Sequence, residues 1–170
     1  MKDFKSIKAG LISENIFKLI GSDWMLITAG DIKKYNTMTA SWGTMGILWH
    51  KNIATCYVRP QRYTFQFMEE NDFYTLSFFG LAHKEILNFC GSHSGKDTNK
   101  IKETGLDPIQ TELGNIAFNQ AKLVLECKKL YADSIKPENF FDKNIPTNIY
   151  AQNDFHKFYI GEIVGCYLKE

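Results

Sequence analysis

The sequence predicts a mainly β fold with short helices, in which the strands form an antiparallel barrel. Segments typical of strands predominate, and the helical segments do not alternate with them one for one, as they do in a doubly wound parallel sheet. Neither GxGxxG nor GxxxxGK[ST] occurs, so the chain lacks the usual nucleotide-phosphate loops. With 170 residues, 44% of them hydrophobic, we expect a single domain over residues 1–170.

Three strands are predicted in the first third of the chain. The apolar run 24–29, closed by Gly30, indicates a strand followed by a turn. A second strand starts near Met38. Residues 53–58 are rich in β-branched and aromatic side chains, and Pro60 then ends the run because proline cannot donate to a ladder.

Short helices and longer strands fill the rest of the chain. From Tyr63, apolar positions give way to Glu69 and Glu70, which predicts a short helix ending before a strand over 73–79. The remaining elements follow from the same periodicities: a helix over 83–90 that Gly91 terminates, a helical turn or two over 97–103 that Gly105 ends, a strand over 121–130, a long connection over 136–146, and one bent strand or two over 155–168.

The charge balance gives the chain no overall field that would attract a polyanion. Lysine and arginine number 20 and aspartate and glutamate 19, a formal net charge of +1, and the lysines are scattered. Nucleic-acid binding needs a basic stripe on one face, and an anionic membrane needs a similar field. We therefore expect no nucleic acid and no membrane among the partners, and any anion site must be local.

Cysteines and histidines are too dispersed to indicate a metal centre or a disulfide framework. Three of the cysteines lie within apolar runs, where a free thiol acts as a small buried hydrophobe. The N-terminus lacks the apolar core of a secretory signal, so we expect a cytoplasmic protein. The residues concerned are Cys56, Cys90, Cys127 and Cys166, and histidines 50, 83, 93 and 156.

A hydroxyl-rich stretch from Asn36 to Gly43 is the first candidate binding surface. It combines an amide, hydroxyls, small side chains and one indole, namely Asn36, Thr39, Ala40, Ser41 and Trp42. Small side chains let a flat ring approach the backbone, whose N–H groups can then bond to ring carbonyls and nitrogens. The alternative is an ordinary polar edge strand.

An arginine-bearing turn is the first candidate anion site. Arg59, Arg62, Tyr63 and Thr64 place two guanidinium groups and a hydroxyl where a strand passes into a helix, which suits a phosphate. The alternative is a pair of solvated arginines beside a helix cap.

The loop containing Ser94, Gly95 and Lys96 is a second candidate anion site. It offers hydroxyls and a lysine before a predicted helix, and Cys90 and Gly91 lie just upstream. The alternative is a capping loop.

In their order along the chain, these segments resemble the flavin reductase-like family of FMN-binding split barrels, especially its flavoredoxin-like branch. The resemblance covers nearly the whole chain. The residues that carry it are 24–31 (WMLITAGD), 36–43 (NTMTASWG), 54–64 (ATCYVRPQRYT), 74–79 (YTLSFF), 87–91 (LNFCG), 94–97 (SGKD), 102–106 (KETGL), His156 and 159–163 (YIGEI).

The resemblance implies an antiparallel Greek-key-type split barrel that forms a homodimer, with FMN in a groove near the dimer interface. Residues 39–42 would line the isoalloxazine, while residues 59–64 and 94–96 would approach the ribityl phosphate. Ser77 and Phe78 would flank the flavin. His156 would lie nearest the nicotinamide or acceptor and is the candidate catalytic residue, although a buried or exposed histidine without a role is the alternative.

Two working modes follow from the resemblance. The protein either reduces flavin with NAD(P)H as electron donor or holds FMN and passes electrons to a redox protein partner. The alternatives are a non-catalytic FMN-binding electron carrier or flavin store, and a barrel that has lost its ligand. Because side chains cannot accept a hydride, redox chemistry requires the cofactor. The RPQRYT turn departs from the shorter, serine-rich loop of relatives that serve a separate monooxygenase.

Overall fold

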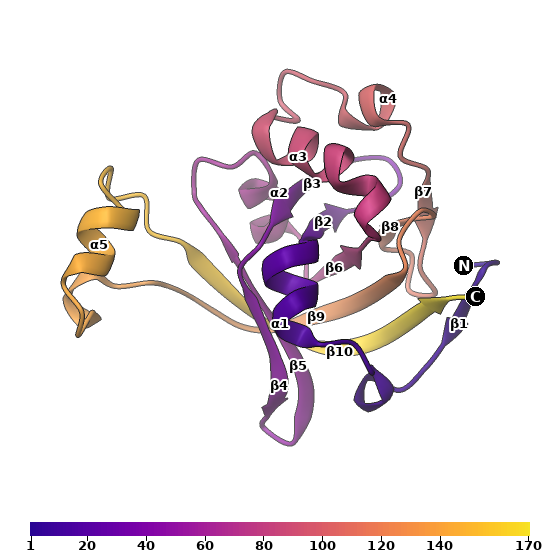
Figure 1. The fold of residues 1–170 in the computed structure, drawn as a ribbon, viewed down its shortest axis with the longest axis horizontal. Coiled ribbons are helices and arrows are strands. Elements are labelled where there is room, and N and C mark those ends of the chain that lie inside the picture. The colour runs from indigo at the N-terminus through magenta and orange to yellow at the C-terminus, as the bar shows by residue number, and fades with distance from the viewer.

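One antiparallel sheet runs through the computed structural model, which describes all of residues 1–170 (Figure 1). Seven strands follow one another in the order β3-β2-β6-β9-β10-β5-β4, and the N-terminal strand β1 adds to β10. The strands are β1 Phe4–Ser6, β2 Met25–Gly30, β3 Tyr35–Ala40, β4 Gly43–Leu48, β5 Lys51–Val58, β6 Phe73–Phe78, β9 Leu123–Ser134 and β10 Lys157–Lys169; β7 Pro108–Gln110 and β8 Ile116–Phe118 form a separate hairpin.

The helices are short and lie between the strands, as predicted. None of them is long or apolar enough to span a bilayer. They are α1 Ile16–Lys18, which continues into the π-helical turn Leu19–Asp23, α2 Thr64–Glu70, α3 Lys84–Ser92, α4 Lys100–Thr104 and α5 Asn144–Ile149, with 3-10 turns at Ala9–Leu11, Leu81–His83 and Pro137–Asn139.

The sheet curls into an open barrel because its two edge strands are joined directly. Strands β3 and β4 stand at opposite ends of the strand order, yet only Ser41 and Trp42 separate them in the chain. Three Cα–Cα steps reach at most about 11 Å, so the two edges must meet at this link. The barrel is not closed by hydrogen bonds there. The mainly β, antiparallel prediction is confirmed.

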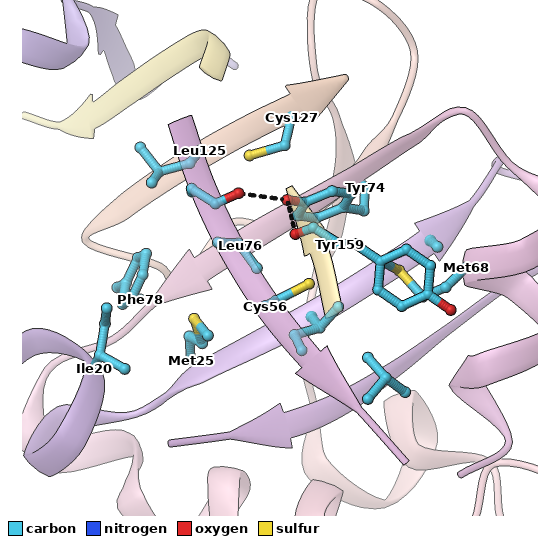
Figure 2. Packing of buried hydrophobic residues seen from close by; sticks show 14 of the residues in the cluster. Ile20, Met25, Cys56, Met68, Tyr74, Leu76, Phe78, Leu125, Cys127 and Tyr159 are labelled. Atoms are coloured by element: carbon cyan, nitrogen blue, oxygen red, sulfur yellow. Dashed lines mark hydrogen bonds between the residues drawn. The ribbon is translucent and has the colours of Figure 1, made fainter. Parts of the chain in front are cut away.

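The buried Tyr74 links three strands in the core of the barrel (Figure 2). Its hydroxyl lies 2.8 Å from the carbonyl oxygen of Ala54 and 3.3 Å from that of Tyr159, so it connects β6 to β5 and β10. A Cβ at Gly161 would lie 2.6 Å from this hydroxyl, which explains the glycine there. All four cysteines are free and buried, as expected for the three in apolar runs.

The structure differs from the prediction at strand β4 and at Gly91. Strand β4 was not predicted, because Gly43 and Gly46 weaken its β propensity and its hairpin turn lacks Asn-Gly; Trp49 and His50 adopt positive φ instead. Gly91 does not terminate the helix over 83–90 but lies inside α3. A Cβ there would be 3.3 Å from Thr39 Cβ, so the glycine allows the helix to pack closely on β3.

The rest of the second half follows the predictions more closely, with two additions, the β7–β8 hairpin and helix α5. Gly105 ends α4 at φ +67°, although α4 begins only at Lys100. Strand β10 is a single strand with register shifts at Ile160/Gly161 and Ile163/Gly165, which account for its bend. The connection predicted over 136–146 contains part of α5. This segment projects from the barrel between the long ends of β9 and β10 (Figure 1).

Candidate functional site

A groove of about 500 Å³ opens at the seam of the barrel, between the end of β3 and the helix α3. Helix α3 packs closely on β3. The Thr39 hydroxyl donates a hydrogen bond to the Leu87 carbonyl, and Gly91 lies against Thr39. The residues that line the groove are Trp24, Met38, Thr39, Ala40, Ser41, Trp42, Tyr57, Arg59, Arg62, Leu87, Asn88, Gly91, Ser92 and His156.

The free edge of β3 gives this groove backbone hydrogen-bonding groups. The Thr37 carbonyl accepts a hydrogen bond from Lys100 Nζ at 2.8 Å, so it points away from the neighbouring strand β2. Peptide groups alternate in direction along a strand, and the N–H and C=O of Thr39 therefore point the same way as those of Thr37. A flat heterocycle in the groove would find both a donor and an acceptor along this edge.

The two arginines of the predicted anion turn differ in their surroundings. Arg59 forms an ion pair with Asp154, donates to the Ile149 carbonyl at 3.1 Å and lies over the Tyr150 ring. Arg62 is half-buried, and its guanidinium has neither a carboxylate partner nor a hydrogen bond within the chain. Burial and the charge of Arg59 lower the pKa of Arg62. An anion beside Arg62 would therefore offset the cost of burying its positive charge next to a second one. Of the two arginines, only Arg62 therefore carries an uncompensated charge.

His156 lies in the groove wall as a neutral imidazole. It is 9% exposed, and its Nδ1 lies 2.9 Å from the Tyr150 hydroxyl. The Trp42 ring packs against it at 5.0 Å between centroids. Burial, followed by the charge of Arg59, lowers the pKa of His156 to about 4, and Asp154 opposes this shift. At pH 7 the ring can donate or accept a hydrogen bond but carries no charge.

A second, polar pocket of about 480 Å³ lies at the other end of β3. Its lining includes four of the predicted site residues, Asn36, Tyr63, Gly95 and Lys96. Four lysines and one aspartate make it electropositive: Lys33, Lys34, Lys96, Lys100 and Asp97.

Lys100 contributes a buried charge to the polar pocket. Only 5% of it is exposed, and its ammonium donates to the carbonyls of Thr37 and Cys90 at 2.8 Å each. Burial lowers its pKa to about 8, Cys90 opposes the shift, and Arg62 adds to it. No carboxylate compensates this charge, which makes it a second cation available to an anion along β3.

The structure divides the predicted site residues into three groups. Thr39, Ala40, Ser41, Trp42, Arg59, Arg62, Gly91 and His156 meet in the groove, and Asn36, Tyr63, Gly95 and Lys96 meet in the polar pocket. The remaining five line neither cavity: Thr64, Ser77, Phe78, Cys90 and Ser94.

The five outliers have simple physical reasons. Ser77 and Phe78 lie on the central strand β6, covered on both faces, and have no exposed surface, so the expectation that they flank a ligand does not hold. Thr64 is buried and accepts a hydrogen bond from the Asn36 amide at 2.8 Å. Cys90 is buried with a raised pKa. Ser94 is exposed, and its hydroxyl accepts from the Lys96 N–H.

Several residues of the groove and the polar pocket carried no signal in the sequence. Trp24, Tyr57 and Leu87 belong to ordinary apolar patterns, which predict core positions as readily as a cavity wall. Lys100 falls on a short helix, where a lysine is usually solvated. Only the glycine at 91, set one turn from Leu87, hints that this face of α3 approaches another element.

Comparison with protein families identifies the domain. The family model described as a flavin reductase-like domain matches residues 17–170. The chain belongs to the flavin reductase-like family. No curated protein matches the chain at a significant level.

Several solved structures share this fold. An FMN-binding domain of a flavin reductase-like enzyme from Shewanella baltica superposes with a TM-score of 0.70 at 16% identity, over 98% of this chain and 77% of that one. A flavoredoxin from Methanosarcina acetivorans gives 0.67 at 20% identity, over 98% and 76%. An NADH:FAD oxidoreductase from Streptomyces globisporus gives 0.63 at 15% identity, over 85% and 73%.

The low pKa of His156 predicts a pH-dependent contribution to stability. The unfolded chain takes up a proton on this residue near pH 6.5 and the folded chain only near pH 4, so acidification between these values favours unfolding. In urea unfolding at a series of pH values, His156→Gln should therefore lose less stability than the wild type as the pH falls from 6.5 to 4. The exposed His50→Gln serves as control. Parallel curves for wild type and His156→Gln would contradict this.

Proposed function

We propose that this flavin reductase-like protein is an FMN-binding oxidoreductase. The observation that carries the proposal is the half-buried guanidinium of Arg62, which has no partner. It lies where the groove, whose small side chains and strand edge suit a flat ring, approaches the electropositive pocket. Arg62 lines the groove and the next residue, Tyr63, lines the polar pocket. The family and its FMN-binding structural neighbours support a flavin as the ligand.

The arrangement and chemistry of the two cavities suit FMN. Strand β3 runs past both of them, with Thr37 at the polar pocket and Thr39 at the groove. A ligand lying along this strand would set its flat ring against the small side chains of Ala40 and Ser41. Its phosphate would then lie toward Arg62 and the lysines of the polar pocket, where charge-assisted hydrogen bonds are strongest.

Electron transfer requires the cofactor, and the side chains supply binding and orientation. Bound FMN can accept a hydride at its ring and release the electrons singly or in pairs. Arg62 and Lys100 would hold the phosphate, and the Thr39 backbone would orient the ring. His156 stays neutral at pH 7, so it offers a hydrogen bond, without charge, to a nicotinamide or another acceptor in the groove.

NAD(P)H is the proposed electron donor, and the rival is a carrier or store that holds FMN without turnover. The Streptomyces neighbour's name as an NADH:FAD oxidoreductase supports the first reading, and the flavoredoxin neighbours favour the second. Anaerobic mixing with NADH or NADPH separates them. We expect rapid bleaching of the flavin absorbance; slow bleaching, no faster than that of free FMN, would favour the carrier or store.

The contrast between Arg62 and Arg59 gives a sharp test of the phosphate site. Arg62→Met should weaken FMN binding by about 1.5–3 kcal/mol, because a hydrogen bond to a charged group is lost, and should leave riboflavin binding unchanged. Arg59→Met is the matched control, since Asp154 already holds that guanidinium. Fluorescence titration of each flavin measures the affinities. Equal losses of FMN affinity in the two variants would contradict the assignment.

We infer that the protein acts as a homodimer in which each arm, Ile135–His156, covers its partner. On the arm, Phe141 is fully exposed, and Ile145 and Ile149 are also exposed. An apolar cleft of about 710 Å³, lined by Phe17, Trp42 and Ile135 among others, opens beside the groove. A second copy of the chain supplies the apolar side chains that such a cleft needs, and self-complementary surfaces favour a two-fold dimer.

Removing the apolar tip of the arm should disrupt this dimer. Phe141→Ser is expected to shift the protein from dimer to monomer in sedimentation equilibrium, because a large ring would no longer be buried between the copies. Leu113→Ser changes another exposed apolar side chain, 59% exposed and located between β7 and β8, and should remain dimeric. A wild-type protein that is monomeric at all concentrations, or an unchanged dimer in Phe141→Ser, would contradict the proposal.

A further inference from the structure

Trp24 lines the groove in a backbone conformation that tryptophan rarely adopts. It follows the π-helical turn Leu19–Asp23 and immediately precedes β2, with φ +69° and ψ 172°. This region is used almost only by glycine, and a residue with a side chain is unfavourable there unless its surroundings fix it. Backbone outliers of this kind cluster at functional sites, where surrounding contacts hold them in place.

The backbone around Trp24 is fixed by a buried ion-pair network. Asp23 is almost fully buried, and its carboxylate pairs with Lys18 at 2.9 Å and with Lys122 at 3.1 Å. Met25, on the other side, is completely buried in the barrel core. The residues before and after Trp24 are therefore restrained by burial and by ion pairs, and these restraints hold the backbone of Trp24 from both sides.

The indole ring itself is fixed by contacts with Gly21 and Lys84. Its Nε1–H donates to the Gly21 carbonyl at 3.1 Å, and the Lys84 ammonium lies 3.1 Å above the ring centroid. The same ammonium donates to the Ser22 carbonyl at 2.5 Å, which prevents it from swinging away. Lys84 covers one face of the ring, Trp24 also packs against the buried cluster that contains Leu26 and Leu87, and the residue forms part of the groove wall.

Trp42, the other indole of the groove, is not held in this way. It is exposed, its ring contacts His156, and it has no hydrogen bond. A wall that is rigid before the ligand arrives loses little conformational entropy on binding. An indole is also electron-rich, whereas an isoalloxazine is electron-poor, and offset stacking of such rings adds to the burial of their surfaces.

We propose that Trp24 is the specificity-determining residue for the ring of the flavin. It is a preformed aromatic wall that selects a flat heteroaromatic ring, whereas Arg62 recognises the phosphate. This inference rests on the proposed FMN function and divides recognition of the ligand between two residues. The two contributions can be measured separately, because lumiflavin carries the ring without the ribityl phosphate.

The test compares FMN and lumiflavin binding in Trp24→Gly by fluorescence titration. Glycine adopts the backbone conformation of residue 24 without strain, so this variant removes the ring and keeps the fold, which far-UV circular dichroism checks. We expect both ligands to bind about tenfold more weakly, by the same factor. Trp49→Ala, at the exposed turn between β4 and β5, is the matched control and should bind both ligands like the wild type.

Lys84→Met provides a second test, in which the indole is still present. Without the ammonium above it, the ring loses one of its fixing contacts, and lumiflavin should bind several-fold more weakly than to the wild type. Lumiflavin affinity within twofold of the wild type in Trp24→Gly would overturn the inference while leaving the FMN function intact. A wild-type protein that binds neither flavin would contradict both.

Discussion

The two-residue link between β3 and β4 is the constraint on which the rest of the structure depends. Ser41 and Trp42 bring the two edges of the sheet together without hydrogen bonds across them, and so leave an open seam. An exposed strand edge is normally covered or blunted. Here α3 covers one part of β3, and the remaining part faces a groove. The position of the binding site is therefore a consequence of how the sheet ends.

Electrostatics then distinguishes groups that the sequence presents as equivalent. Arg59 and Arg62 are three residues apart, but Asp154 neutralises the first and leaves the second without a partner. Lys100 is buried against two carbonyls with no carboxylate nearby. Both uncompensated cations lie along β3, at the meeting point of the groove and the polar pocket. A phosphate is the ligand group that would balance them.

Much of this architecture could be predicted from the sequence, because the strands and their stops have local causes. The run before Gly30, the stop at Pro60 and the left-handed Gly105 each act through neighbouring residues. Strand β4 could not be predicted, since its glycines and its unusual Trp49–His50 turn give no local signal. Gly91 was misassigned because its role, close packing on Thr39, involves a residue distant in sequence.

The candidate site was predictable to the extent that its residues lie together in the chain. Residues 39–42 reach the groove as one stretch. Trp24 and Lys100 could not be assigned, because their roles depend on partners brought in by tertiary structure, Lys84 for the indole and the Thr37 and Cys90 carbonyls for the ammonium. Ser77 and Phe78 failed for the opposite reason, since burial on a central strand removed them from any ligand.

The most direct measurement of the central claim is a crystal structure of the protein grown with FMN. The account predicts the isoalloxazine in the groove between β3 and α3, within hydrogen-bonding distance of the Thr39 backbone, and the phosphate beside Arg62. A flavin bound elsewhere, or a phosphate turned away from both Arg62 and Lys100, would contradict it.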